Sequence, residues 1–177
     1  MPDTMKVERE EIDESEWATI QNVIEEALQN ILNFRKDEGE SLEKEFQLRI
    51  GNIRQFMNEA LALDPERVQA IKDRLQTAIA ELQVNVDENR FEQELIYYLE
   101  KLDITEEKVR LGNHLNYFLE TLNGTEANGR KLGFITQEMG REINTMGSKS
   151  NHTEMQKLVV MMKDELEKIK EQVLNVL

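Results

Sequence analysis

Several residue types are scarce or missing in this chain, and each shortage excludes a class of structure or chemistry. The 177 residues include no cysteine, which excludes disulfide bonds, thiolate metal sites and a thiol nucleophile. Only two prolines occur and aromatic residues make up 6%, so long helices are favoured over a β fold. No apolar run approaches the roughly 20 residues that cross a bilayer, and no signal-peptide pattern opens the chain. These shortages favour a cytoplasmic, bacterial-type protein without a membrane segment.

Positive charge is also scarce, and it is concentrated in one stretch. The chain carries 36 acidic and 22 basic residues, a net charge of −14, which argues against non-specific binding to nucleic acid or anionic lipid. Between residues 128 and 149, however, four cations stand against two carboxylates, so this stretch carries +2 and the rest of the chain −16. We therefore expect a polyanionic ligand to bind at a confined site here rather than on a broad basic patch.

Apolar residues recur at helical spacing along most of the chain. The pattern predicts one very long helix, or two nearly collinear ones, over residues 14–62, and Asp64 with Pro65 predicts a new helix that returns antiparallel. A helix of that length must pack as a coiled-coil-like hairpin or against another subunit. Shorter helices are predicted to begin at Asp87, at Thr105, near residue 128 and at Thr153, where Thr153 and Gln156 form a capping box.

The predicted fold class is therefore all-α, an elongated helical bundle with a long coiled-coil-like antiparallel hairpin followed by shorter helices. We divide the chain into residues 1–85, the long helical hairpin that serves as a linker and oligomerisation region, and residues 86–177, a C-terminal helical domain. Alternating residues within 5–9 are compatible with a short strand or with an ordered lead-in.

The stretch from Gly129 to Lys149 separates into three faces on a helix at 100° per residue. An ordinary buried stripe is made of Leu132, Ile135, Met139, Ile143 and Met146. A polar face combines cations, an amide, a carboxylate and one aromatic ring: Arg130, Phe134, Gln137, Glu138, Arg141, Thr145 and Ser148. The third face is glycine: Gly129, Gly133, Gly140 and Gly147. Glycine costs about 1 kcal/mol in a helix interior, so this face predicts a neighbour at close range. We favour helix packing over a ligand.

Two groups of side chains could support chemistry. Glu138 and Glu142 lie one turn apart and could share a hard divalent cation, although spacing alone favours ordinary salt links. Phe134 could stack on a base, but a packing contact explains it more simply. Another stripe, Glu106, Arg110, His114 and Tyr117, is typical of a solvated helix face. A histidine and an arginine near carboxylates are nevertheless what metal-assisted or acid–base phosphodiester cleavage requires.

Several segments of the chain resemble the YicC/YloC family of bacterial proteins. These are V-D-E-N-R-F at 86–91, D-I-T-E-E at 103–107, R-L-G-N-H-L at 110–115 and L-V-V-M-M-K-D-E-L-E-K-I-K-E-Q-V at 158–173. The longest and most specific match is the block at 129–149, G-R-K-L-G-F-I-T-Q-E-M-G-R-E-I-N-T-M-G-S-K. Gly133 and Gly140 depart from many relatives, which have Asp and Asn there. Relatives also begin with a further N-terminal region, so we expect this chain to correspond to a C-terminal portion.

The resemblance implies a divalent-metal-dependent endoribonuclease, or an RNA-decay factor, that assembles as an oligomer, a hexamer in the family. The catalytic residues that it implies are His114, Glu138 and Glu142. The implied RNA-binding residues are Arg110, Arg130, Lys131, Phe134, Gln137, Arg141, Asn144 and Lys149. The implied ligands of a Mg or Mn ion are Glu138, Glu142, Asp103 and Glu106.

The leading hypothesis is thus the C-terminal part of a metal-dependent endoribonuclease that acts on single-stranded RNA in RNA decay. Its expected partners are RNA, further copies of itself and an RNA-decay enzyme. The alternative is a non-catalytic helical adaptor or oligomerisation module that presents the 129–149 block to RNA or to a decay enzyme.

Overall fold

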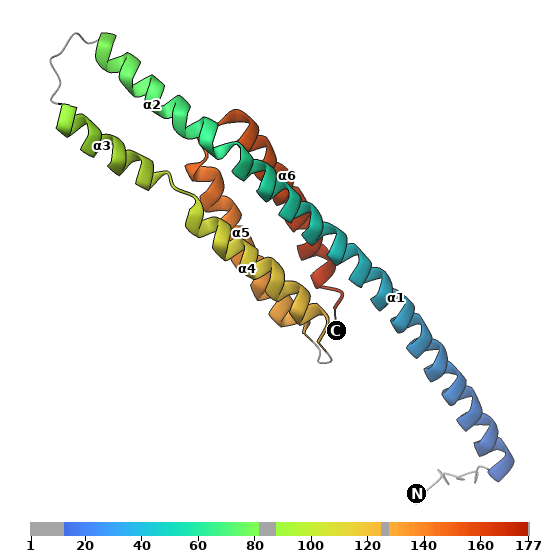
Figure 1. The fold of residues 1–177 in the computed structure, drawn as a ribbon. Coiled ribbons are helices and arrows are strands. Elements are labelled where there is room, and N and C mark those ends of the chain that lie inside the picture. The colour runs from blue at the N-terminus through green and yellow to red at the C-terminus, as the bar shows by residue number, and fades with distance from the viewer. Residues whose placement is uncertain (1–12, 82–87, 125–127, 177) are drawn as a thin grey trace, which may run out of the picture. The chain divides into compact units, whose positions relative to one another are not determined.

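The computed structural model describes residues 13–81, 88–124 and 128–176, and in these ranges all regular secondary structure is helical (Figure 1). The helices are α1 (Glu14–Ala62), α2 (Asp64–Glu81), α3 (Glu88–Lys101), α4 (Thr105–Leu122), α5 (Gly129–Lys149) and α6 (Thr153–Val173). The predicted all-α class, with one long helix followed by shorter ones, is confirmed. The possible strand within 5–9 and the helix start at Asp87 lie outside the described residues. None of the described helices has the length and apolar character of a membrane span.

Contacts divide the chain into two compact units, Met1–Ser41 and Leu42–Leu177. The first unit, where it is described, is the N-terminal part of α1. The second unit contains the rest of α1 and all later helices, and it carries every residue that the sequence singles out as functional.

The chain does not turn back at Asp64 and Pro65, so this part of the prediction is wrong. The N–H of Leu63 bonds to the carbonyl of Ala60 and that of Arg67 to the carbonyl of Leu63, so helical bonding continues across the junction. Proline lacks one donor and crowds the preceding turn, which bends a helix without necessarily ending it. The chain reverses its direction instead between α2 and α3, so that α3 and α4 run in the direction opposite to α2 (Figure 1).

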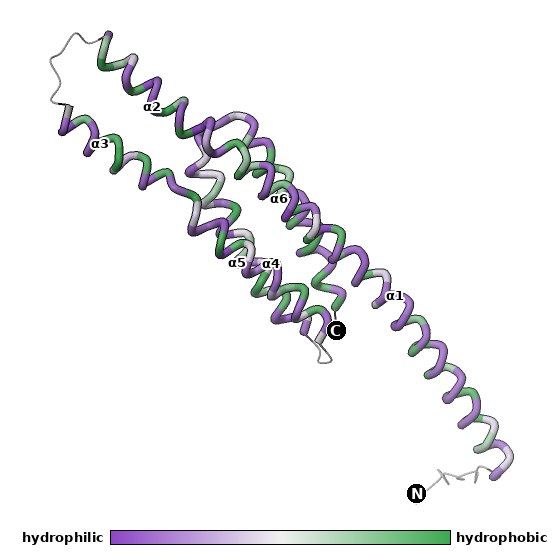
Figure 2. The backbone as a smooth tube through the Cα atoms, in the orientation of Figure 1, coloured by the Kyte–Doolittle hydropathy of each residue, from purple (hydrophilic) through white to green (hydrophobic). Residues whose placement is uncertain are grey.

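The hydrophobic core lies among four helices: the later part of α1, α4, α5 and α6. Phe46 of α1 meets Phe118 of α4 edge to face, with ring centroids 5.5 Å apart. All five members of the predicted apolar stripe of α5 are buried, which confirms that face. Hydrophobic and hydrophilic residues alternate in short bands along each of these helices, as amphipathic helices around a shared core require (Figure 2).

The glycine face of α5 packs against α6. A Cβ added at Gly147 would lie 2.9 Å from Cγ1 of Val159, and one at Gly140 would lie 3.3 Å from Cδ2 of Leu166. One at Gly129 would clash with the carbonyl oxygen of Val176. The residue numbers of the glycines increase along α5 while those of their neighbours decrease along α6. The two helices therefore run antiparallel, with glycine facing bulky residues. The prediction of close helix packing is confirmed.

The ends of α4 and α6 are built differently from the prediction. His152 rather than Thr153 caps α6, and its Nδ1 accepts a hydrogen bond from the N–H of Met155. The side chain of Gln156 cannot complete a capping box because it donates to the carbonyls of Gly147 and Ser150. At α4, the side chain before the helix is that of Ile104, which cannot cap.

A buried carboxylate joins α1 to α6. Glu165 of α6 is buried, and it accepts hydrogen bonds from Arg49 and Asn52 of α1 and from Lys168. Burial alone would raise the pKa of Glu165, but the hydrogen bonds from Lys168, Asn52 and Arg49 outweigh it and hold the pKa below its usual value. The ionised form is therefore the one that stabilises the α1–α6 contact.

We predict opposite effects for two alanine substitutions on the glycine face. Gly147→Ala should destabilise the fold by about 1–3 kcal/mol because its methyl group would press on the stiff, β-branched Val159. Gly133→Ala should be neutral or stabilising by up to about 1 kcal/mol, because its Cβ would lie 3.8 Å from Val173, an ordinary contact, and alanine favours the helix. Urea unfolding of both variants measures the difference, and equal effects would contradict the packing described.

We also predict that Glu165 makes the fold sensitive to acid. A carboxylate whose folded pKa is depressed stabilises above its unfolded pKa and loses that contribution as the pH falls through the folded value. The free energy of unfolding should therefore decrease as the pH is lowered below 4.5, the ordinary pKa of a glutamate side chain. This decrease should be smaller in Glu165→Gln. Glu167→Gln, an exposed carboxylate on the same helix, is the matched control. Equal pH profiles for the two variants would refute the prediction.

Candidate nucleic-acid interface

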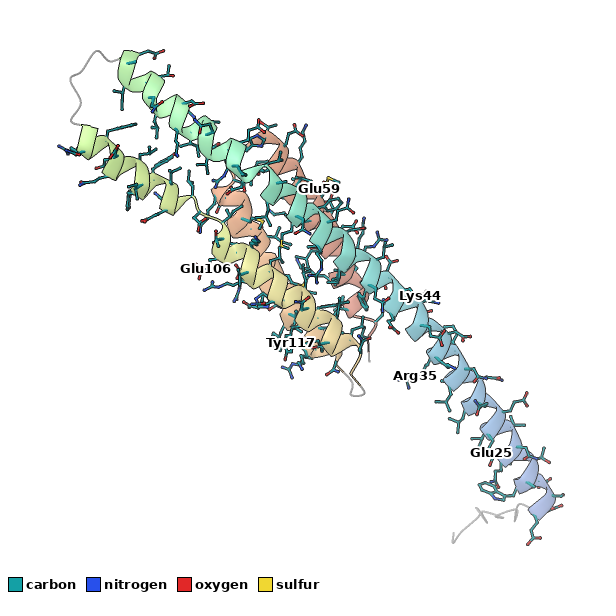
Figure 3. The ribbon with its side chains drawn as sticks, viewed as in Figure 1. Glu25, Arg35, Lys44, Glu59, Glu106 and Tyr117 are labelled. Atoms are coloured by element: carbon teal, nitrogen blue, oxygen red, sulfur yellow. The ribbon has the colours of Figure 1, made fainter. Side chains whose placement is uncertain are left out.

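Helices α4 and α5 lie antiparallel and are joined along one edge by three contacts between polar side chains. The ammonium of Lys131 lies 4.8 Å from the ring centroid of Tyr117. Nη1 of Arg110 lies 4.0 Å from Oε1 of Glu142, and the ammonium of Lys149 lies 2.7 Å from Oε1 of Glu107. We call this edge the α4–α5 seam; Figure 3 shows Glu106 and Tyr117 on α4, the helix that forms one side of it.

The centre of the seam brings together residues from two sequence segments. Arg110 pairs with Glu106 one turn earlier on α4 and with Glu142 on α5, so one guanidinium connects two carboxylates. His114 follows Arg110 by four residues, and Glu138 precedes Glu142 by four, so the antiparallel register places His114 at the level of Glu138. Glu138 also pairs with Arg141 at 2.7 Å. All three predicted catalytic residues therefore lie within about two turns of this central part.

The far end of the seam is a buried ionic contact. Glu107 is only 4% exposed, and Lys149 donates to its carboxylate and, at 2.9 Å, to the backbone carbonyl of Asp103. Arg67, itself buried, donates to the carbonyl of Lys149 at 3.0 Å and pairs with Asp64. The predicted RNA-binding residue Lys149 is thus engaged within the protein, where it ties the start of α4 to the end of α5.

Glu107 is the residue of this site that the sequence-based prediction missed. Its second carboxylate oxygen, Oε2, is buried and has no hydrogen-bond partner in the part of the chain that the structure describes. Its burial could have been predicted from its spacing, because Glu107 precedes Leu111 and Leu115 at intervals of four residues and so shares their buried face.

The four carboxylates predicted to hold a metal ion do not converge on one point. Asp103 lies at the Lys149 end of the seam, about three helical turns along α5 from Glu138. Its carboxylate accepts from the hydroxyl of Thr105 at 2.9 Å, and Glu106 is occupied by Arg110. No group of three potential ligand side chains at metal-binding spacing occurs among the described residues.

A smaller set fits the chemistry of a magnesium-like ion. Such ions are usually held by one or two carboxylates, with water molecules and substrate phosphates completing the shell. Glu138 and Glu142 lie one turn apart on the same helix, and the only cation close to Glu142 in the described ion pairs is Arg110, at 4.0 Å. This pair fits an ion that is completed by a phosphate, and Asp103 and Glu106 do not contribute to it.

A groove lies beside the other end of α5, where α6 ends. It has a volume of about 380 Å³ and is lined by Gly129, Arg130, Gly133, Phe134, Gln137, Val173, Leu174 and Val176. We call it the Phe134 groove. Phe134 is 57% exposed, and the guanidinium carbon of Arg130 lies 6.0 Å from its ring centroid. Three of the predicted RNA-binding residues thus share one concave surface.

The remaining predicted contacts are exposed at intermediate positions on α5. Asn144 and Arg141 are exposed between the two ends of the helix. Of the predicted RNA-binding set, therefore, the structure separates an exposed group, Arg110, Arg130, Lys131, Phe134, Gln137, Arg141 and Asn144, from the engaged Lys149.

Comparison with known proteins defines the class of protein to which this site belongs. Residues 60–177, which include the whole seam and the Phe134 groove, match the family described as "Endoribonuclease YicC-like, C-terminal". The chain belongs to this YicC-like endoribonuclease family. The match covers both motif segments that the α4–α5 seam brings together.

Two curated relatives are similar over most of this chain. A protein of Clostridioides difficile strain 630 named "Probable endoribonuclease YicC" is 36% identical over 179 residues, which cover 99% of this chain and 61% of the relative. A Haemophilus influenzae protein of the same name is 31% identical over 151 residues, which cover 85% of this chain and 53% of the relative. The chain thus matches between about half and three fifths of the length of these relatives.

We predict that Lys149 is required for stability. Lys149→Met should lower the free energy of unfolding by about 3 kcal/mol, because it leaves the buried carboxylate of Glu107 without its cation. Adding Glu107→Gln should recover part of the loss. Lys163→Met removes the same charge at an exposed position of α6 and should change the stability by less than about 0.5 kcal/mol. Denaturant unfolding measures the free energy of unfolding of all three variants. An unchanged value in Lys149→Met would show that the Lys149 ammonium does not stabilise the fold.

Proposed function

We propose that this chain is the RNA-binding and cleaving part of a divalent-metal-dependent endoribonuclease that acts on single-stranded RNA. The observation that carries the proposal is the centre of the α4–α5 seam, where Arg110 of α4 contacts Glu142 of α5. His114 lies one turn after Arg110 on α4, and Glu138 lies one turn before Glu142 on α5. Membership of an endoribonuclease family supports the same reaction class.

Exposed cations along α5 are suited to hold the phosphates. Arg130 and Lys131 occupy the first turn of α5, which contains no acidic residue. Cations at the positive end of a helix dipole are unfavourable for the helix itself, but together with the free N–H groups they attract an anion. Arg141 is 72% exposed farther along the helix, so its guanidinium can reach solvent. In a chain of net charge −14, this is where a phosphate backbone meets the least repulsion.

The Phe134 groove supports the preference for unpaired RNA. A base can stack on an aromatic ring only when it is free of its own strand's stacking, and such stacking contributes about 1–3 kcal/mol per base. Phe134 presents an exposed ring beside the apolar side chains of Val173 and Leu174, and Arg130 lies next to it. We expect one base in this groove, with Gln137 at its polar rim.

Cleavage would take place at the centre of the seam. Glu138 and Glu142 would hold the divalent ion, Mg or Mn, which when bound neutralises charge on the phosphate and activates water. His114, one turn after Arg110 on α4, would move a proton to or from the reacting oxygen. Arg110, which already contacts Glu142, would position the phosphate next to these carboxylates.

The adaptor hypothesis keeps one specific observation in its favour. Glu106, Glu138 and Glu142 each have an arginine partner within the protein, as expected of side chains that only stabilise two helices. Under either hypothesis we expect the protein to act in the cytoplasm on RNA, as a homo-oligomer, and to meet an RNA-decay enzyme.

We predict that the chain binds single-stranded RNA through the exposed arginines of α5. Arg130→Ala with Arg141→Ala should weaken binding of a fluorescent single-stranded RNA at least tenfold. It should also reduce the salt slope of the affinity by about 1.4, the value for two fewer phosphate contacts on a single strand. Fluorescence anisotropy measures both. Lys157→Ala with Lys163→Ala removes the same charge from exposed positions of α6 and should change the affinity little. Equal losses in the two double variants would mean general electrostatics rather than this site.

Cleavage of the same RNA separates the two hypotheses. We expect the chain to cleave the RNA in the presence of Mg²⁺ or Mn²⁺, and we expect EDTA to abolish this cleavage. Glu138→Gln and Glu142→Gln should each reduce the cleavage rate at least 100-fold and leave RNA binding intact. Cleavage that persists in both variants would refute the metal assignment. Binding without cleavage at any metal concentration would favour the adaptor.

A further inference from the structure

Tyr117 is an exposed aromatic residue of the α4–α5 seam to which the proposed function gives no role (Figure 3). Its side chain is 44% exposed, whereas the next residue, Phe118, is fully buried in the core. The ammonium of Lys131 lies 4.8 Å from the centroid of the Tyr117 ring. A cation at this distance is attracted to one face of a ring, and the other face stays open to stacking. Tyr117 therefore presents an aromatic surface beside a positive charge.

A second pair of a cation and an aromatic ring lies on the other side of Lys131. Phe134 follows Arg130 by one helical turn, and the guanidinium carbon of Arg130 lies 6.0 Å from its ring centroid. Around α5, Phe134 falls between the two cations, about 40° from Arg130 and about 60° from Lys131. Lys131 in turn lies between the Phe134 ring and Tyr117 of α4. Cations and rings therefore alternate across this surface: Arg130, Phe134, Lys131 and Tyr117.

The charge on α5 favours a phosphate beside Lys131. Residues 129–137 contain two cations and no acid. The next carboxylate on α5 is that of Glu138, which lies one turn beyond Phe134 and is paired with Arg141 at 2.7 Å. A phosphate near Lys131 would therefore meet net positive charge on this part of α5.

The acids of α4 do not oppose this arrangement. Glu120, the carboxylate nearest to Tyr117 along α4, is exposed and falls about 60° around the helix from it. Arg110, which contacts α5, lies on the opposite side of Tyr117, so Glu120 lies on the side that faces away from Lys131. Glu126, the last acid before α5, lies outside the described residues.

The seam continues from this contact to the proposed cleavage centre. Arg110 precedes Tyr117 by seven residues, about two helical turns or about 10 Å along α4. Arg110 contacts Glu142, one of the two carboxylates proposed to hold the divalent ion. RNA bound at Tyr117 would therefore lie on the same edge of the bundle as the proposed site of cleavage.

We propose that Phe134 and Tyr117 bind two neighbouring bases of single-stranded RNA and that Lys131 binds the phosphate between them. This inference rests on the proposed function, and it adds a second base to the one expected in the Phe134 groove. Aromatic rings combined with cations hold single strands without selecting sequence, because every base has a face that stacks. The site therefore accepts any base and requires two adjacent unpaired nucleotides.

Fluorescence anisotropy with a labelled single-stranded RNA tests the contribution of the ring. Tyr117→Leu should weaken binding at least about fivefold, which corresponds to about 1 kcal/mol, the lower value for one stacked base. Tyr117→Phe keeps the ring and should bind within about twofold of the wild type. Tyr97→Leu removes an exposed tyrosine of α3 and should leave the affinity unchanged.

The salt dependence of the affinity separates the ring from the cation. Lys131→Met should reduce the salt slope by about 0.7, the value for one phosphate contact on a single strand. Tyr117→Leu removes no charge, so it should lower the affinity and leave the slope unchanged. A slope that Lys131→Met does not change would contradict the phosphate contact.

Tryptophan fluorescence tests whether a base stacks at this position, since a stacked base quenches the emission of an indole ring. Single-stranded RNA should quench the emission of Tyr117→Trp more than that of the wild type, whose one tryptophan is Trp17. Tyr97→Trp is the matched control and should show no added quenching. Duplex RNA of the same sequence should quench less, because its bases are stacked within the helix.

The outcomes distinguish this inference from the function on which it rests. The Tyr117 variants replace an exposed side chain, so their circular dichroism should match that of the wild type. Unchanged RNA affinity in Tyr117→Leu, or no added quenching in Tyr117→Trp, would overturn the second base site and leave the proposed function standing. A wild-type chain that binds no single-stranded RNA would overturn both.

Discussion

The close approach of α5 to α6 is the constraint on which the rest of this domain depends. Glycines at seven-residue intervals on α5 face Val159, Leu166 and Val173 on α6, and at two of them an added methyl group would be crowded. Because the two helices meet on that face, the stripe from Leu132 to Met146 turns into the core and the arginine face remains at the surface. Tight packing thus decides which residues are available to a ligand.

Buried charge provides a second restraint at both sides of the bundle. Glu165 ties α6 to α1, and Glu107 ties α4 to the end of α5 through Lys149. Removing one partner of such a pair leaves an uncompensated charge in a poorly solvated site, which is more destabilising than losing an exposed ion pair. The side chains at the centre of the α4–α5 seam are thus carried by two helices that Glu107 and Lys149 tie together at one end.

Much of the fold and part of the candidate site could be predicted from spacing. The stripe, the glycine face and the polar face of α5 follow from a period of 3.6 residues, and each is found where the sequence placed it. The turn of the hairpin could not be predicted, since proline in a first turn fits both a helix start and a bent helix. The role of Lys149 was also beyond reach, because its partner Glu107 lies 42 residues earlier in the chain.

The amino-acid sequence by itself determined the helical class, the faces of α5 and the motif that defines the family. These are local or periodic properties, and a helix expresses them wherever it lies. Only the tertiary structure decided that Arg110 lies against Glu142, that Lys149 is held by Glu107, and where the Phe134 groove opens. Those properties depend on the antiparallel register of α4, α5 and α6, which is set by side-chain volumes packed between helices and not by the spacing of residues within any one of them.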